Sequence, residues 1–131
     1  MSAQHTKTTE GITVRIASYY EEGSSRPHNQ YFAFSYVVEI ENNSPFEVQL
    51  ISRYWLIKDA NKDQKEVNGV GVIGKQPIIK PGELHHYSSW SPLATPIGKM
   101  TGYYTMKRLM DGSTFKVYIP EFQLVADFIN N

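Results

Sequence analysis

The sequence predicts an all-β protein: an antiparallel β-sandwich of the immunoglobulin or fibronectin type III kind, with about seven to eight strands. Two observations support this prediction. Apolar and polar residues alternate with a period of two in successive segments, and no segment sustains the period of 3.6 that marks a helix. Turn residues separate these segments at short intervals. A small β-barrel is the alternative that the same pattern allows.

The first half of the chain contains three predicted strands. In the first, Ile12 and Val14 lie on one face. The second alternates most clearly, with Phe34 and Tyr36 on the face expected to meet the core. The third is apolar on both faces, so it should lie centrally in its sheet with Trp55 in the core. The expected ranges are residues 11–20, 31–41 and 46–58, with polar loops or turns at 21–29, 42–45 and 59–64.

The second half begins with a stretch rich in glycine and proline and then returns to alternation. Strands are expected at residues 83–90, 100–109 and 114–119, with a loop at 91–96. Asp111-Gly112 supplies the positive φ of a tight hairpin turn between the last two strands. Pro120 is expected to bend the final strand, which resumes beyond it. Tyr103 or Tyr104 occupies the place where such sandwiches keep a corner tyrosine, and we expect Tyr104 in the core.

The composition limits both domain number and function. The chain has 131 residues, which fit one domain at 11–126 between a flexible tail at 1–10 and a second tail at 127–131. The second tail is expected to be frayed or to form a short helical turn. Basic and acidic residues number 13 each, so no net charge attracts nucleic acid or an acidic membrane. The absence of cysteine excludes disulfides and thiolate metal sites. The polar N-terminus and the lack of a long apolar run lead us to expect a cytoplasmic protein without a membrane partner.

A glycine-rich stretch offers the most suggestive motif. Gly69, Gly71 and Gly74 match the pattern G-x-G-x-x-G of dinucleotide-binding loops. In those loops a helix begins directly after the glycines, and its N-terminal N–H groups hold the pyrophosphate. Here Pro77, Pro81 and the β-forming residues between them prevent a helix. The dinucleotide-binding interpretation therefore fails on context.

Two interpretations of the glycine stretch remain. In the first, Gly69 and Gly71 lie on one face of a strand beneath an aromatic ring, such as Trp90 or a tyrosine, and the last glycine makes a turn. In the second, backbone N–H groups of this turn, with Lys75 and Gln76 beside them, hold a phosphate oxygen. We favour the first, because a glycine triplet without a helix is a weak indication of phosphate binding.

No catalytic or metal site is expected. His85 and His86 are adjacent on a predicted strand and point to opposite faces, so they cannot bind one ion together. Glu21, Glu22 and His28 share a polar loop, which is far more often a solvated loop than a divalent-metal site. No nucleophile elbow or triad pattern occurs. We therefore expect a non-enzymatic protein without a cofactor.

Spaced matches over most of the chain resemble a known family. They are Val67-Asn-Gly-Val-Gly-Val-Ile-Gly-x-Gln-Pro77, Pro81-Gly-Glu83, Tyr87-x-Ser89, Leu93-x-Thr-Pro96, Gly98-x-Met100, Gly102-x-Tyr104-x-Met106 and Ile119-Pro-x-Phe122. With these motifs the chain resembles the bacterial ApaG family from about Gly11 to Leu124. The resemblance implies a fibronectin type III-like sandwich, in agreement with the periodicity.

The resemblance also implies a function. Related domains recur in eukaryotic F-box and polymerase-interacting proteins as interaction modules, so we expect a protein partner. The family is genetically associated with cobalt resistance and magnesium efflux, and a pyrophosphate or nucleotide role has been suggested for its glycine motif. A phosphate-containing small molecule is thus the alternative ligand. The chain departs from the family at Tyr54, commonly histidine; at Lys75, commonly acidic; and at Trp90, commonly glycine. Lys75 favours an anion, whereas Trp90 crowds the same region.

Overall fold

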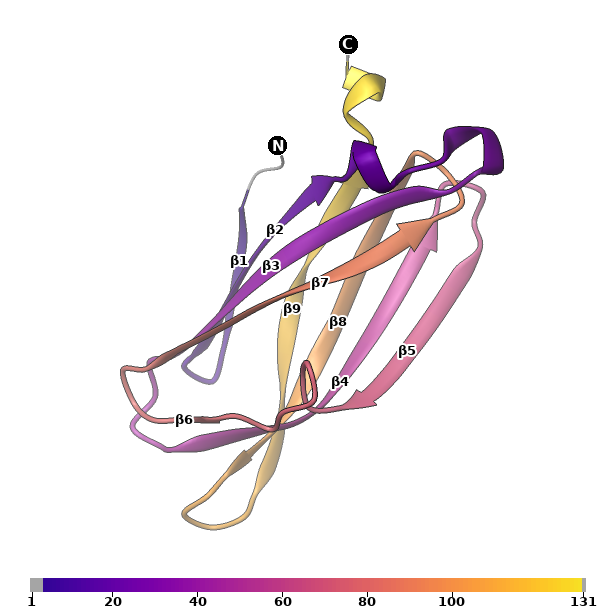
Figure 1. Cartoon of the computed structure of the whole chain (residues 1–131). Coiled ribbons are helices and arrows are strands. Elements are labelled where there is room, and N and C mark those ends of the chain that lie inside the picture. Colours follow the sequence, from indigo (N-terminus) through magenta and orange to yellow (C-terminus); the bar gives the residue numbers. More distant parts are fainter. Residues whose placement is uncertain (1–3, 131) are drawn as a thin grey trace.

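Antiparallel strands build two facing sheets in the computed structural model, which describes residues 4–130 (Figure 1). The strands are β1 His5–Thr9, β2 Ile12–Tyr20, β3 Phe32–Asn42, β4 Val48–Asp59, β5 Gln64–Val70, β6 Ile78–Ile79, β7 Leu84–Leu93, β8 Ile97–Arg108 and β9 Thr114–Val125. One sheet has the order β1-β2-β3-β7, and the other has β5-β4-β8-β9 with β6 paired to β4. The predicted antiparallel sandwich is confirmed, with nine strands in the described residues and two separate sheets rather than one closed barrel.

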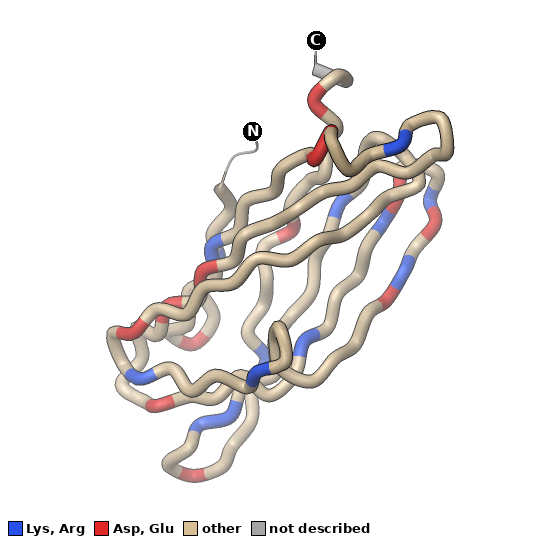
Figure 2. Tube along the Cα trace, viewed as in Figure 1, with Lys and Arg blue, Asp and Glu red and all other residues tan. Residues whose placement is uncertain are grey.

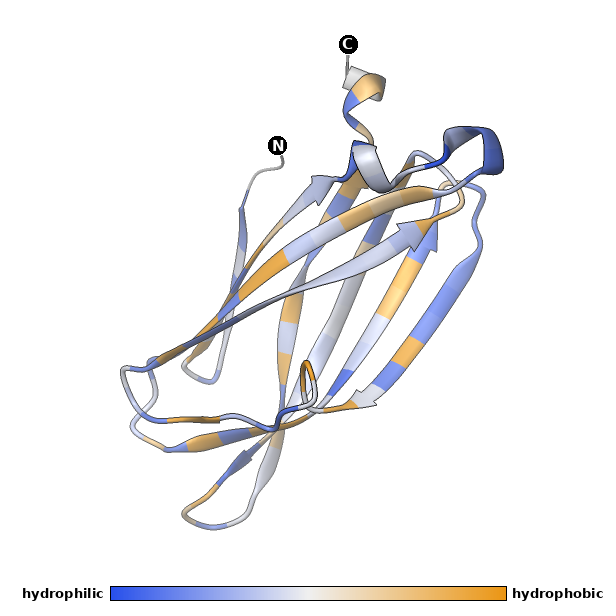
Figure 3. Ribbon diagram, in the orientation of Figure 1, coloured by the Kyte–Doolittle hydropathy of each residue, from blue (hydrophilic) through white to orange (hydrophobic). Residues whose placement is uncertain are grey.

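The core lies between the two sheets and comes from alternate residues of their facing strands. Figure 3 shows this alternation as apolar and polar bands along the strands. The four aromatic residues expected in the core, Phe34, Tyr36, Trp55 and Tyr104, are all at most 5% exposed. The ring of Trp55 contacts Tyr36 at 5.4 Å and Phe122 at 6.0 Å between centroids, both edge-on. Edge-on packing of this kind adds to the stabilisation from burial.

The two long sides of the sandwich differ. Along one side, β1 and β2 lie against β9, and the N–H of Tyr118 donates to Thr9 Oγ1 at 3.3 Å. Along the other side, β5 and β7 are the outer strands of their sheets, and no ladder joins them in the described chain. We call this second side the open side. It contains the glycine motif and the space described below.

The structure adds strands that alternation did not indicate. Residues 1–10 are predicted to be a flexible tail, but residues 5–9 form β1, which pairs with β2. β1 contains no apolar residue, so backbone hydrogen bonds to β2 hold it in place of a buried face. β5, which contains Gly69, is largely exposed, and β6, which follows the glycine turn, has only two residues. Residues 1–3 of the expected tail, and residue 131 of the second tail, lie outside the described chain.

Two further strand boundaries differ from prediction, and the bend at Pro120 agrees with it. β7 continues to Leu93 through the expected loop, and β8 begins at Ile97. β9 continues past Pro120, which lies where the β8–β9 register shifts, so the proline occupies a bulge as the expected bend suggests. The first long loop contains two 3₁₀ turns, η1 Glu22–Ser24 and η2 Pro27–Asn29, and the chain ends in η3 Asp127–Asn130.

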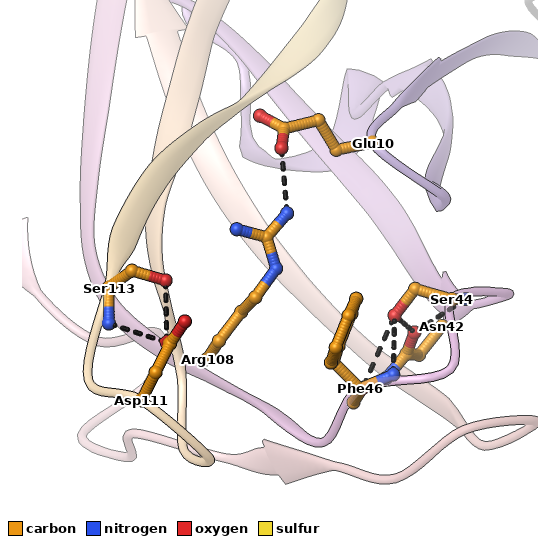
Figure 4. Close-up of polar contacts among 7 residues, drawn as sticks. All are labelled: Glu10, Asn42, Ser44, Phe46, Arg108, Asp111 and Ser113. Atoms are coloured by element: carbon orange, nitrogen blue, oxygen red, sulfur yellow. Dashed lines mark hydrogen bonds and ion pairs between the residues drawn. The ribbon is translucent and has the colours of Figure 1, made fainter.

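A buried asparagine fixes the connection between the sheets (Figure 4). Asn42 is fully buried, and its Nδ2 donates to the carbonyl oxygens of Phe46 at 2.7 Å and Ile79 at 2.9 Å. Its Oδ1 accepts the N–H of Ser44 at 2.9 Å and the Ser44 hydroxyl at 2.6 Å. The side chain therefore replaces the missing backbone partners of the turn after β3.

Polar contacts also fix two neighbouring turns at the same end of the sandwich. Arg108 Nη2 donates to Glu10 Oε1 at 2.7 Å and joins the β1–β2 turn to the end of β8 (Figure 4). In the β8–β9 hairpin, Asp111 accepts the N–H and the hydroxyl of Ser113, and these bonds lower the pKa of the Asp111 carboxyl. Gly112 has a φ of 73°, as predicted for this turn.

Candidate functional site

The glycine motif lies at the end of β5, on the open side. The chain leaves the sheet after Val70, makes a tight turn, and returns along β4 as β6. Within the turn, the N–H of Val72 donates to the Lys75 carbonyl at 2.8 Å, and the Lys75 N–H donates to the Val72 carbonyl at 3.0 Å. Ile73 and Gly74 between them have φ values of 48° and 71°. Two successive positive φ values are what a two-residue hairpin turn requires.

Glycine is required at each of the three motif positions for a different physical reason. A Cβ at Gly69 would lie 2.5 Å from Cζ of Arg53, so glycine makes room for the guanidinium. Gly71 has a φ of 63°, and a Cβ there would lie 2.0 Å from the carbonyl oxygen of Lys75. Gly74 has open space around it and is needed only for its positive φ. The motif thus builds a strand end and a turn.

Among residues 4–130, no aromatic ring is among the nearest groups to Gly69 or Gly71, where an aromatic cover was expected. Gly69 pairs with Arg53 across β4 and β5, so the guanidinium is the nearest group above it. Gly71 does not share the strand face of Gly69, because its positive φ turns the chain out of β5. Trp90, the suggested cover, lies on β7 and is 59% exposed. Arg53 was not among the residues that the sequence singled out.

The residues suggested for phosphate binding come together in one loop, but several of their donors are used internally. Gln76 Nε2 donates to the Ile51 carbonyl at 3.0 Å, and the Gly71 N–H donates to the same carbonyl at 2.8 Å. The N–H groups of the two central turn residues make no hydrogen bond within residues 4–130, and Lys75 makes no ion pair there. Those two amides and one ammonium are the donors left for an anion.

A small space opens between β5 and β7 beside this loop. It measures about 210 Å³, and Tyr36, Arg53, Trp55, Ser89, Trp90 and Ser91 are among its lining residues. We call it the edge slot. Arg53 Nη1 donates to the carbonyl oxygens of Gly71 at 2.7 Å and Val70 at 3.2 Å, which ties the slot to the glycine stretch.

Buried phenols lie near the slot. The hydroxyls of Tyr87 and Tyr104 share a hydrogen bond between the sheets. Burial raises the pKa of both groups, and the effect is large for Tyr104, which is fully buried. Burial also raises the pKa of Tyr36, partly offset by a hydrogen bond with the Ser89 side chain. These phenols are therefore neutral wherever the protein is folded near neutral pH.

The outer face of the five-stranded sheet presents a row of tyrosines. Tyr54, Tyr103 and Tyr118 are direct neighbours on β4, β8 and β9. The first two rings stack at 5.0 Å, and the second pair meets edge-on at 6.2 Å. Lys116 Nζ lies 4.5 Å from the Tyr103 ring and Lys7 Nζ lies 5.7 Å from the Tyr118 ring. We call this row the tyrosine face.

A shallow groove adjoins the tyrosine face. It measures about 410 Å³ and runs between Tyr54, Tyr103 and the exposed Val70. Glu66 accepts the Tyr54 hydroxyl at 2.8 Å, and this bond is the largest cause of a raised Tyr54 pKa. Figure 2 shows positive charges along β4 and β8 of the same sheet. The face is thus an aromatic row with basic neighbours.

The loop considered for a metal has another role. Glu21 Oε2 accepts the hydroxyl of Ser35 at 2.6 Å, and so does not converge with Glu22 and His28 on a common point. Within residues 4–130, no group of three or more His, Cys, Asp or Glu side chains is arranged to hold a metal ion. In that same range no helix has the length and apolar character needed to cross a membrane.

Fold and site together define a class: small antiparallel β-sandwiches with a glycine-rich turn on the open side. The model of the ApaG domain (DUF525) matches residues 22–108. Protein ApaG of Brucella abortus strain S19 is 46% identical over 120 residues, covering 92% of each chain. Protein ApaG of Maricaulis maris is 45% identical over 114 residues, covering 87% of each. The chain therefore belongs to the ApaG family.

Solved structures support the same conclusion. The crystal structure of a Bordetella pertussis protein described as ApaA superimposes with a TM-score of 0.85 at 40% identity, covering 88% of this chain and 94% of that one. The C-terminal domain of wzt gives a TM-score of 0.52 at 10% identity, covering 94% and 77% respectively. That second likeness concerns the fold alone.

Proposed function

We propose that this protein is a non-enzymatic interaction module that binds a protein partner through the tyrosine face. The supporting observation is the unbroken row of Tyr54, Tyr103 and Tyr118 across three neighbouring strands. Tyrosine offers a large, rigid contact area with a polar end, and it is enriched at protein interfaces and among the residues that dominate binding energy. A row held on strands also loses little conformational entropy on binding.

The charges around the row indicate the chemistry of the partner. Lys7 and Lys116 lie over tyrosine rings, and Lys58 pairs with Lys99 across β4 and β8. Glu66 is engaged by the Tyr54 hydroxyl. A partner surface with carboxylates around an apolar residue complements this arrangement, the apolar residue entering the groove beside Val70.

Matched variants test the proposal. The wild type, Tyr118→Ala, Lys116→Glu and the control Tyr31→Ala would be immobilised and exposed to cell lysate at low and high salt. Tyr31 is 45% exposed and precedes β3 in the other sheet, so its loss should leave the tyrosine face intact. We expect one stoichiometric partner on wild type and control, with affinity lower by about tenfold or more for the two face variants. High salt should also weaken capture. A partner retained equally by all four proteins would refute the assignment of the face.

The alternative is an anion binder at the glycine turn. It is favoured by the unused N–H groups of Ile73 and Gly74 and by the unpaired Lys75 within the described chain. Titration of ¹⁵N-labelled protein with pyrophosphate, ATP and GTP separates the two ideas. Saturable shifts of the amides at 72–76 that disappear in Lys75→Glu would support the alternative. No saturable change at millimolar ligand would exclude it.

A further inference from the structure

Both inner faces of the sandwich become polar at the same place. The inward row of β4 is Arg53, Trp55 and Ile57, and Arg53 interrupts an otherwise apolar series. Opposite it, β7 places Ser89 and Ser91 at inward positions where a sandwich core normally has apolar residues. All of these residues line the edge slot. Polar residues at core positions reduce apolar packing, and in natural proteins such departures from the core pattern are concentrated at functional sites.

Arg53 is a half-buried cation with no anionic partner among the described residues. Arg53 forms no ion pair within residues 4–130. Of its three nitrogens only Nη1 donates a hydrogen bond there, to the carbonyl oxygens of Gly71 and Val70. Nε and Nη2 have no acceptor in that range. A guanidinium that is partly withdrawn from water gains from pairing with a carboxylate or phosphate, because desolvation of its charge is costly. The slot therefore contains an unused anion-binding group.

Ser91 provides a second, independent observation. It is only 4% exposed, and its Oγ makes no hydrogen bond with any described residue. A buried hydroxyl without a partner is rare and destabilising. Ser89, two residues earlier on the same face, is hydrogen-bonded with Tyr36. Within residues 4–130, an unpartnered hydroxyl and a guanidinium without an ion pair thus line one space that aromatic side chains also line.

We propose that the edge slot binds a small aromatic carboxylate. The guanidinium of Arg53 and the hydroxyl of Ser91 bind the carboxylate, and Tyr36 and Trp55 contact the ring. One cation matches one negative charge, and the planar guanidinium fits a planar carboxylate better than a tetrahedral dianion. The space of about 210 Å³ is below the roughly 300–1,000 Å³ of pockets for drug-sized ligands, so it suits a single ring. The slot lies between the sheets and the tyrosine face lies on the outer surface, although Arg53 also lines the groove beside Val70. The proposal does not rest on the proposed function.

Nuclear magnetic resonance titration tests the proposal with defined probes. Benzoate and phenylacetate are added to ¹⁵N-labelled protein in a buffer free of carboxylates, and benzamide and inorganic phosphate are added in parallel. We expect saturable shifts of the Arg53 Nε–H, the Trp55 indole N–H and the Ser89 and Ser91 amides with the carboxylates. Benzamide has the same ring without the charge, so it should give no saturable change.

Two variants separate binding from folding. Ser91→Ala removes a hydroxyl that no described residue uses, so thermal stability should not fall while carboxylate affinity drops about tenfold. Gly69→Ala places a Cβ 2.5 Å from Cζ of Arg53, which displaces the flexible guanidinium and abolishes binding. Tyr31→Ala should bind like the wild type. The proposal is overturned by any of four results: no saturable shift with either carboxylate, equal binding of benzamide, saturation by phosphate alone, or unchanged affinity in Ser91→Ala.

Discussion

Alanine substitution at the three motif glycines should give three different losses of stability. At Gly74 nothing lies within 4 Å of the added Cβ, so only the positive φ of 71° is unfavourable. That conformation costs an L-residue about 1–2 kcal/mol. Alanine also lowers the conformational entropy of the unfolded chain, which offsets about 0.4–1 kcal/mol of this cost. We therefore expect Gly74→Ala to lose about 1 kcal/mol in the free energy of unfolding.

Gly71→Ala should lose much more. It has the same unfavourable φ, and its Cβ would lie 2.0 Å from the backbone oxygen of Lys75, which accepts the N–H of Val72. Relieving that overlap breaks the paired hydrogen bonds of the turn, at about 1 kcal/mol each. Together with the strain, the loss becomes about 3–4 kcal/mol.

Gly69→Ala meets only the flexible end of Arg53, so we expect a loss of about 1 kcal/mol as its hydrogen bonds to two carbonyls weaken. Urea unfolding followed by tryptophan fluorescence, with the m-value checked for constancy, measures all three. A loss at Gly74 equal to that at Gly71, or a Gly71 variant within about 1 kcal/mol of wild type, would refute this account of the motif.

Other predictions concern the core, a buried turn and alkaline pH. Trp55→Ala, at a site only 3% exposed, should lose about 3–5 kcal/mol in urea unfolding, and a midpoint near wild type would contradict its core role. Asn42→Ala should lose about 2–3 kcal/mol because it leaves several buried groups without a hydrogen-bond partner. The control Asn43→Ala, at an exposed neighbouring position, should lose less than about 0.5 kcal/mol, and equal losses would contradict the argument. Burial raises the pKa values of Tyr87 and Tyr104 in the folded protein. Unfolded phenols ionise near pH 10, so the free energy of unfolding is unaffected by these groups below about pH 10. Above that pH it should fall by up to about 1.4 kcal/mol per pH unit for each phenol. Tyr87→Phe should make that decline shallower, as followed by urea unfolding at several pH values, and an unchanged slope would count against it.

Alternation of side chains predicted those strands that bury one face. β2 and β3 place apolar residues inward at every second position, so period two was enough to find them and to assign Phe34 and Tyr36 to the core. β1 and β5 escaped because their side chains are largely exposed, and backbone pairing to a neighbour holds them. A strand that is held mainly by backbone pairing to a neighbour shows no clear apolar alternation in its own sequence.

The site was harder to predict because the contacts that form it depend on the register between strands. Gly69 and Arg53 are distant in sequence and meet only because β4 and β5 pair at that point. One indication was available in the sequence. Arg53 interrupts the apolar series that continues at Trp55 and Ile57, and such an interruption in a central strand suggests a polar group with a purpose inside the sandwich.

The glycine motif and the edge slot form one unit of structure. Gly69 leaves room for the guanidinium of Arg53, and that guanidinium binds the carbonyl oxygen of Gly71, whose own close approach to Lys75 sets the turn. A phosphate cradle would direct N–H groups and the nearest cation toward one point. Here Arg53 instead faces carbonyl oxygens of the glycine stretch, which turn their negative ends toward it. The spacing that resembles a nucleotide motif therefore shapes a wall of the slot. The donors that it leaves for an anion within the described chain are the N–H groups of Ile73 and Gly74 and the ammonium of Lys75.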